Sequence, residues 1–127
     1  MAIDLNHTIV YVQDKRVSAE FITDLFGLGE PESWGPFLAV ELSNRVTLDF
    51  YDADGRRGVQ HYAFLVGEEE FDAIFGRIQD RGLDYWADPG HRLPGQINRH
   101  DGGRGVYFDE PGGHNLEIIT RPYGAER

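Results

Sequence analysis

Cysteine is absent from the 127 residues, and serine is scarce. Without cysteine the chain has no disulfides, thiolate nucleophiles or cysteine-ligated zinc sites, and this usage fits a reducing compartment. The three serines are not part of a G-x-S-x-G motif, which excludes the nucleophile elbow of the hydrolases. The glycine-rich stretch 102–105 precedes an expected strand rather than a helix, so it does not form a phosphate site.

Positive charge and long apolar runs are also lacking. Lysine and arginine total 12 against 22 acidic residues, which gives a net charge of −10. A nucleic-acid partner requires a basic face, and none is visible, so none is expected. No apolar run reaches the length of a membrane span, and residues 1–4 lack the basic and apolar parts of a signal peptide. We therefore expect a cytoplasmic protein, whose 40% hydrophobic residues suffice for a globular core.

An internal repeat organises what is present. Residues 5–12 align with residues 59–66, and the alignment places His7 on His61 at an offset of 54 (61 − 7). Apolar residues match along both rows, and the same offset carries Val17 onto Phe71. Both halves therefore predict an apolar strand with a central histidine, followed by an amphipathic helix that ends at glycine.

Periodicity predicts the remaining elements. Asp14 is the expected N-cap of the first helix, and Val17, Phe21 and Leu25 follow at helical spacing before a terminal Gly27 or Gly29. The second helix begins with three glutamates and ends at Gly82. A turn-rich connection is expected at 31–36, and the expected strands are 4–12, 37–42, 45–51, 59–66, 83–87, 105–108 and 115–120.

The repeat predicts an α+β fold of two paired βαβββ modules. One such module cannot cover its own sheet, whereas two side by side form a half-barrel cup with the helices outside. The expected single domain spans 3–122, with modules at roughly 3–52 and 58–122, and a polar tail at 123–127 that frays.

Three residues of the repeat have the chemistry of a metal site. Two histidines and one carboxylate form a common ligand set for divalent transition metals. His7 and His61 supply the imidazoles, and Glu117, between the apolar Leu116 and Ile118, supplies the carboxylate. Structural roles stay open, because a strand histidine is more often a satisfied core or surface residue and a strand glutamate usually faces solvent.

Asp49 is the counterpart of Glu117 in the first half, since Leu48-Asp49-Phe50 aligns with Leu116-Glu117-Ile118. It is a candidate fourth ligand, proton-transfer group or substrate contact. A role other than ligand is favoured because aspartate is one methylene shorter than glutamate.

The loop 88–103 is the expected lid. With Arg104 it carries a concentration of basic residues that either present cations to an anionic or enolate-like substrate or solvate an exposed glycine-rich loop. The aromatic residues that either line a pocket or belong to the core are Trp34, Phe37, Tyr51, Tyr62 and Trp86.

The chain resembles the vicinal oxygen chelate superfamily, which includes glyoxalase I, fosfomycin-resistance enzymes, extradiol dioxygenases and bleomycin-resistance proteins. The resemblance covers roughly residues 3–122 and rests on Asn6-His7-Thr8, Gln60-His61-Tyr62 and the segment 105–117. It implies that His7, His61 and Glu117 bind a divalent metal, with iron, manganese, nickel and zinc all compatible with the ligands.

A narrower resemblance concerns the extradiol ring-cleavage signature. Asn98-Arg99-His100 followed by Tyr107, Pro111, Gly113 and Glu117 resembles that motif, which implies an acid–base role for His100 and a substrate hydrogen bond from Tyr107. Familiar extradiol enzymes are about twice as long, with four modules, and the second half of the motif is shared by many other relatives.

The favoured hypothesis is a small metal-dependent enzyme that chelates its substrate through vicinal oxygens, either a lyase or isomerase or a ring-cleaving dioxygenase. Asp49, His100 and Tyr107 are its candidate catalytic residues. A homodimer is expected, in which His7 meets the partner's His61 and the partner's Glu117. The alternative is a bleomycin-resistance-like protein that sequesters a drug without catalysis, and a third reading is an inert relative.

Overall fold

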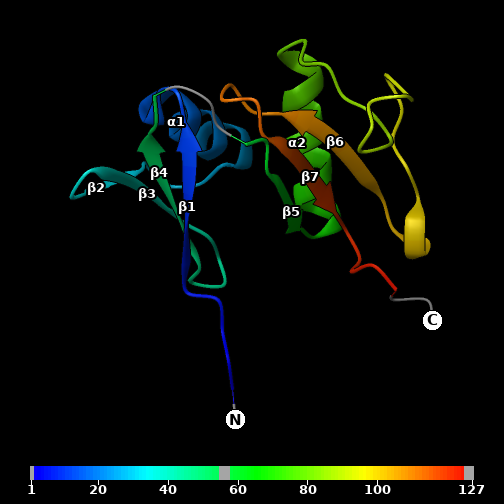
Figure 1. Cartoon of the computed structure of the whole chain (residues 1–127). Coiled ribbons are helices and arrows are strands. Elements are labelled where there is room, and N and C mark those ends of the chain that lie inside the picture. The colour runs from blue at the N-terminus through cyan, green and yellow to red at the C-terminus, as the bar shows by residue number, and fades with distance from the viewer. Residues whose placement is uncertain (1, 55–57, 125–127) are drawn as a thin grey trace. The chain divides into compact units, whose positions relative to one another are not determined.

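The computed structural model describes residues 2–54 and 58–124 (Figure 1). The chain divides into two compact units, residues 1–58 and 59–127, and each unit is described by itself. Both combine one helix with one small sheet, which confirms the α+β class with paired modules. Residues 125–127 of the expected tail lie outside the described part of the chain.

The first unit has the order strand, helix and three strands. Its elements are β1 (His7–Val12), α1 (Lys15–Phe26), β2 (Glu32–Trp34), β3 (Phe37–Glu41) and β4 (Thr47–Asp52). The sheet order is β1-β4-β3-β2, with β1 and β4 parallel and the other pairs antiparallel. Helix α1 packs on β1, β3 and β4, whose buried side chains on that face include Val10, Val12, Leu38, Val40, Leu48 and Phe50.

Helix α1 begins and ends where the sequence predicts. The Asp14 carboxylate accepts hydrogen bonds from the amides of Arg16 and Val17, and Gly27 ends the helix with a left-handed φ of 70°. Its expected apolar face is partly wrong, because Val17 is 51% exposed and the buried face includes Ala19 and Ile22 instead. Small side chains such as Ala19 let a helix approach a sheet closely, and this contact outweighs the apolar spacing.

The connection at 31–36 contains a strand that the turn signals concealed. Strand β2 pairs with β3 antiparallel, with Trp34 opposite Phe37 across a turn that includes Gly35 at φ 56°. It is a short edge strand, and Trp34 remains 72% exposed. Strand β2 supplies the third strand after the helix in the predicted βαβββ order.

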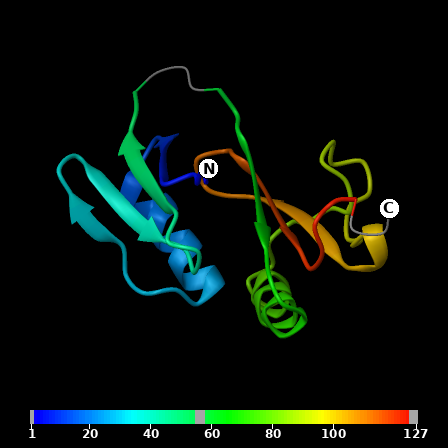
Figure 2. The same ribbon diagram turned by 90° about the horizontal axis from the view of Figure 1, so that it is seen from below.

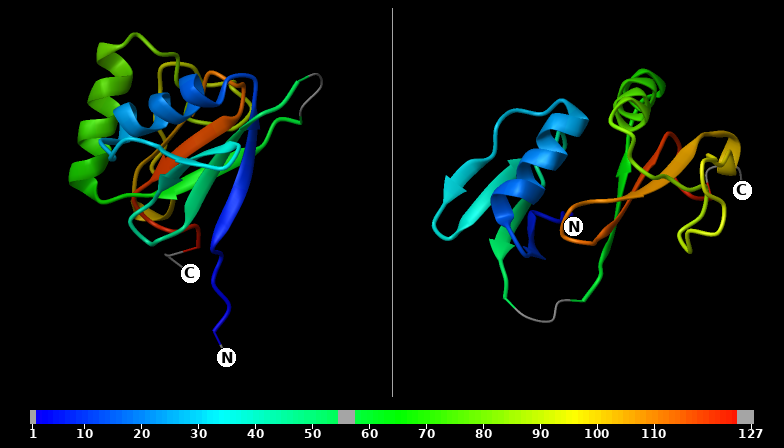
Figure 3. Two further views of the ribbon diagram at one scale, coloured as in Figure 1. Left: turned by 90° about the vertical axis from the view of Figure 1, so that its left-hand side faces the viewer. Right: turned by 90° about the horizontal axis from the view of Figure 1, so that it is seen from above.

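The second unit repeats the parallel pairing of the first. Its elements are β5 (His61–Leu65), α2 (Glu68–Asp80), the short 3₁₀ helix η1 (His100–Gly102), β6 (Gly105–Asp109) and β7 (Asn115–Ile119). The sheet order is β5-β7-β6, with β5 and β7 parallel, and α2 lies along one face of this sheet (Figures 2 and 3). The buried core residues of this unit include Phe71, Ile74, Ile78, Val106, Phe108, Leu116 and Ile118.

The strand predicted at 83–87 is reduced to isolated bridges at Trp86, which pairs with Tyr107 on one side and Pro94 on the other. Directly afterwards the Asp88 carboxylate accepts from the amides of Arg92 and Leu93 and turns the chain back. This side-chain turn competes with the sheet ladder, so the prediction of a full strand was wrong.

The two units share one register. In β1 and β4, His7 pairs with Thr47, and Asp49 lies two residues further along. In β5 and β7, His61 pairs with Asn115, and Glu117 lies two residues further along. Because side chains alternate along a strand, the histidine and the acidic residue share a sheet face in each unit. The alignment of Asp49 with Glu117 thus has the same structural register in both.

Candidate functional site

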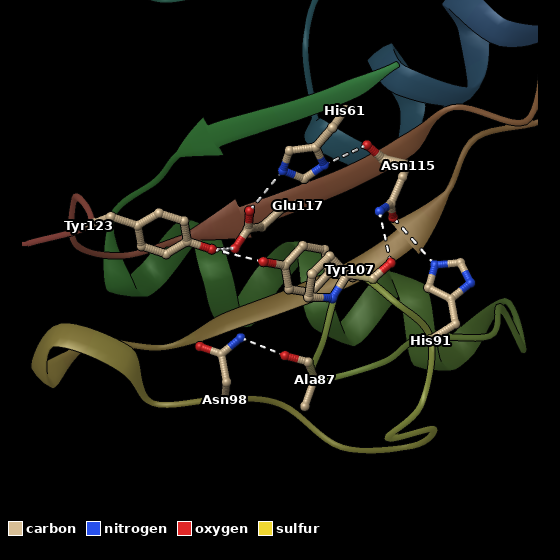
Figure 4. A network of polar contacts seen from close by, with 9 residues as sticks. His61, Ala87, His91, Asn98, Tyr107, Asn115, Glu117 and Tyr123 are labelled. Atoms are coloured by element: carbon tan, nitrogen blue, oxygen red, sulfur yellow. Dashed lines mark hydrogen bonds and ion pairs between the residues drawn. The ribbon is translucent and has the colours of Figure 1, made fainter. Parts of the chain in front are cut away.

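The centre of the site in the second unit is the pair His61 and Glu117. The imidazole Nε2 lies 3.1 Å from Oε1 of Glu117 (Figure 4). Glu117 is fully buried at 0% exposure, whereas 44% of the His61 side chain is exposed. A buried carboxylate is unfavourable without polar partners. The pair therefore forms a polar site inside the unit that is open to solvent at the His61 imidazole.

The other nitrogen of His61 determines what Nε2 can bind. Nδ1 lies 3.1 Å from the backbone carbonyl oxygen of Asn115, and a carbonyl oxygen only accepts, so Nδ1 carries a proton. Nε2 therefore faces Glu117 Oε1 with either a proton or a metal ion between them. An imidazole held through Nδ1 by a carbonyl is the usual arrangement of a metal-binding histidine, and these residues fit a divalent metal.

Two tyrosines complete the polar environment of Glu117. The Tyr123 hydroxyl donates to Oε2 of Glu117, and it lies 2.8 Å from the Tyr107 hydroxyl. Because the Tyr123 hydroxyl uses its one proton in the hydrogen bond to the carboxylate, Tyr107 is the donor in the bond between the two phenols. Burial raises the pKa of Tyr107 and of Tyr123, and the nearby Glu117 raises both further. Both phenols therefore stay protonated at neutral pH.

A second group of contacts surrounds Asn115, whose backbone holds His61. His91 stacks on Trp86 with ring centroids 3.6 Å apart, and its Nε2 lies 3.4 Å from Oδ1 of Asn115. The same nitrogen lies 3.6 Å from Asp109 Oδ1. Burial raises the pKa of Asp109, while the charge of His91 opposes this rise. This part of the expected lid is docked on the sheet.

His100 and Tyr107, paired by the sequence motif, have different surroundings. Tyr107 is buried beside Glu117, and its ring stacks on His61. His100 is exposed in η1, and among the described residues its imidazole forms no hydrogen bond or ion pair. Its backbone amide instead donates to Asn98 Oδ1, and Asn98 is tied to the Ala87 carbonyl (Figure 4).

Arg104, a candidate cation for substrate, has a structural role. Its guanidinium lies 2.8 Å from both Glu68 and Asp72 and 4.4 Å from the centre of the Phe71 ring. These contacts fasten α2 to the start of β6.

The first unit carries the other predicted site residues. His7 is exposed, and its Nδ1 lies 2.7 Å from Oδ1 of Asn6, so Nδ1 carries a proton and Nε2 is the nitrogen available to a metal. Asp49 is only 8% exposed, and its carboxylate forms no hydrogen bond or ion pair with any residue that the structure describes. Within either unit, the described residues contain no group of three or more His, Asp or Glu arranged to hold a metal by themselves.

Sequence comparison identifies the family. The sequence model of the Glyoxalase/Bleomycin resistance protein/Dioxygenase superfamily matches residues 4–118. The chain belongs to this superfamily. It is the vicinal oxygen chelate superfamily that the sequence motifs indicate, so this resemblance is confirmed.

Three relatives of this superfamily member are informative. The glutathione transferase FosA of Serratia marcescens is 29% identical over 121 residues, which cover 90% of this chain and 78% of FosA. The structure of oxidase ChaP-H1 is 60% identical with a TM-score of 0.94, covering 97% of this chain and 99% of that one. The E126Q mutant of FosX from Listeria monocytogenes, complexed with Mn(II) and a dihydroxypropylphosphonic acid, is 21% identical with a TM-score of 0.72, covering 99% and 96%. That last likeness concerns the fold alone.

Superfamily membership and these relatives support a metal-dependent enzyme that acts on a small molecule. Divalent metal is used within the family, as the Mn(II) complex of FosX illustrates. Among the described residues, no helix is both long enough and apolar enough to span a membrane.

Proposed function

We propose that this protein is a divalent-metal-dependent oxidase or ring-cleaving dioxygenase whose metal is held by His7, His61 and Glu117. The observation that carries the proposal is the His61–Glu117 pair, in which a solvent-accessible imidazole nitrogen faces a buried carboxylate. The reaction class is supported by the 60% identity to a protein named an oxidase. When bound, the metal supplies Lewis acidity and open positions for two substrate oxygens.

The protein residues around this centre have separate roles in the proposal. The Asn115 carbonyl keeps His61 in the tautomer with Nε2 available. Tyr107, protonated and buried, donates to Tyr123, and its phenol oxygen is the candidate acceptor for a substrate hydroxyl. Asp49, buried without a described partner, is the candidate group for accepting a substrate proton. His100 stays the candidate for acid–base chemistry from the loop, with an exposed imidazole free to approach a bound ligand.

The proposed ligand set draws on both units of the sequence. His7 belongs to residues 1–58, and His61 and Glu117 belong to residues 59–127. We propose that the protein is a homodimer in which His7 of one chain joins the partner's His61 and the partner's Glu117. The exposed edge strand of a small open sheet is a feature that dimerisation commonly covers.

Elemental analysis of protein purified without a histidine tag tests the metal centre. We expect about one iron, manganese, nickel or zinc per chain, lost in His61→Ala. A His114→Ala variant is the matched control for removing an imidazole, because the buried His114 Nδ1 accepts from the amide of Gln60 outside the ligand set. Absence of metal in the wild type, after reconstitution with each ion, would refute the proposal.

Two assays on the loaded protein separate the reaction classes. Oxygen uptake with catechol-type substrates supports the oxidase or dioxygenase, whereas glutathione addition to fosfomycin supports a transferase like the named FosA relative. We expect oxygen uptake to be lost when a chelator removes the metal and to be restored when one particular metal is added back. Transferase activity without oxygen uptake would replace the proposed reaction and leave the metal centre in place.

Mixing two inactive variants tests whether the site is shared between chains. His7→Ala and Glu117→Gln chains each lack one proposed ligand. If ligands come from two chains, a mixed dimer has one intact site, and random mixing restores about a quarter of the wild-type activity. No recovery from a verified mixed dimer would place all three ligands in one chain.

Drug sequestration remains a second candidate because of the first unit. Exposed aromatic side chains, Tyr11, Tyr51 and Trp34, share that unit with the buried Asp49 carboxylate. Such residues bind a planar cationic molecule without catalysis. Quenching of tryptophan fluorescence by a cationic drug, unchanged by chelator, would favour this function.

A further inference from the structure

Tyr123 reaches the proposed metal centre from outside the strands. It lies in the segment that follows β7, and its side chain points back so that its hydroxyl meets Glu117 (Figure 4). The residue is 55% exposed overall, although its hydroxyl is engaged by Glu117 and Tyr107. The phenol is therefore attached to the site by its polar end while much of the residue faces solvent.

With Tyr123 in place, each carboxylate oxygen of Glu117 has a partner. Oε1 faces Nε2 of His61, and Oε2 accepts the Tyr123 proton. Rotation about the last bond of a glutamate side chain is soft, so one partner alone leaves the carboxylate free to turn. With Oε2 held, Oε1 is the oxygen presented beside the imidazole.

Tyr107 holds the Tyr123 hydroxyl in place by donating a hydrogen bond to its oxygen. Tyr107 is 5% exposed and opposite Glu117 in the β6–β7 pairing. It donates to the Tyr123 oxygen, and a phenol that accepts a hydrogen bond becomes a stronger donor through its own proton. The order is therefore Tyr107 to Tyr123 to Glu117.

We propose that Tyr123 is a positioning residue for Glu117. It holds Oε2 so that Oε1 is presented to a metal beside Nε2 of His61. The inference rests on the proposed function for its metal, whereas the orientation of the carboxylate is a property of the metal-free chain. Partners that orient metal ligands typically contribute ten-fold to a hundred-fold to metal affinity.

The test compares Tyr123→Phe with Tyr85→Phe by calorimetric titration of metal-free protein with Mn(II). Tyr85 is the matched control, because it lies in the same unit with its ring edge against Phe75. We expect Tyr123→Phe to weaken Mn(II) binding by about ten-fold or more, and Tyr85→Phe to leave it within about two-fold. Unchanged affinity in Tyr123→Phe overturns the proposal, and tighter binding does so as well, because it shows that the phenol competes with metal for Glu117.

A second readout uses no metal. Imidazole nitrogen signals of ¹⁵N-labelled metal-free protein report the partner of each ring nitrogen, and loss in His61→Ala assigns His61 among the five histidines. We expect the ¹⁵N chemical shift of His61 Nε2 to change in Tyr123→Phe and to be unchanged in Tyr85→Phe. An unchanged His61 Nε2 chemical shift in Tyr123→Phe overturns the proposal, whatever the Mn(II) affinities show. If the wild type binds no Mn(II), the proposed function loses support, and this spectrum alone decides whether Tyr123 orients Glu117.

Discussion

At the scale of single residues, the site depends on how one buried carboxylate is satisfied. Glu117 has no exposed surface, and its described partners are His61 on one oxygen and Tyr123 on the other. Partners of this kind offset the loss of hydration that would otherwise exclude a charge from the core. A metal ion that binds beside Nε2 of His61 therefore finds a carboxylate oxygen that folding has already desolvated.

Glu117→Gln separates metal binding from folding. Glutamine keeps the shape of the side chain, and its amide can donate to His61 Nε2 while its oxygen accepts from Tyr123. We expect metal affinity to fall by more than the roughly hundred-fold that supporting residues contribute, with a melting temperature within a few degrees of wild type. Calorimetric titration and thermal unfolding of the same samples check both parts. Metal binding equal to wild type would remove Glu117 from the ligand set.

At the scale of elements, each unit depends on a parallel strand pair joined through a helix. A parallel pair requires a crossover, and α1 supplies it between β1 and the later strands of the first unit. The correct start of α1 thus determines the chain direction that follows His7. Asp14 fixes that start through two backbone amides.

Asp14→Ala tests this cap. Two amides at the first turn of α1 lose their acceptor, and we expect the free energy of unfolding to fall by about 1 kcal/mol, within a range of 0.5–2. Urea unfolding followed by circular dichroism measures the change. Asp24→Ala, further along the same helix, is the control for removing an aspartate. A loss below the error of the method would mean that backbone solvation replaces the cap.

At the scale of the whole molecule, acidic residues outnumber basic ones, and pH affects stability through particular contacts. The Thr120 hydroxyl and then the Arg104 guanidinium lower the pKa of Glu68. A lowered pKa in the folded state adds stability above the ordinary value, and that stability disappears as pH falls through the folded value. Burial instead raises the pKa of Asp109, so ionised Asp109 opposes folding as pH rises.

Glu68→Gln is therefore expected to reduce the fall in melting temperature between about pH 5 and about pH 3. The mutant lacks the carboxylate whose protonation breaks the link from α2 to Arg104. Glu69→Gln, the next residue of the same helix, is the control, and calorimetry across the pH series is the measurement. Parallel curves for wild type and Glu68→Gln would show that this contact does not contribute to acid unfolding.

Local patterns in the sequence predicted much of this structure. The capping Asp14, the terminal Gly27 and the shared faces of β4 and β7 follow from spacing, because neighbouring residues determine them. The strand at 83–87 and the connection at 31–36 were predicted incorrectly, because Asp88 and the pairing of Trp34 with Phe37 overrode local signals.

The candidate site divides in the same way. His61 and Glu117 were found because the repeat made them the counterparts of His7 and Asp49, and the structure brings them together. Tyr123 and the docking of His91 on Asn115 were missed. Each depends on a loop or an end segment folding back, for which periodicity gives no signal.

The common register of the two units has a consequence for protein design. One frame, a histidine strand paired in parallel with a strand that bears an acid two positions further on, occurs twice in this chain. The second frame holds its carboxylate between His61 and Tyr123, whereas the first leaves the Asp49 carboxylate without a described partner. The first frame thus has the backbone of such a pair, with a shorter acid whose carboxylate has no described partner. Lengthening its acid by one methylene and supplying a tyrosine donor is a route to a second centre without any new backbone.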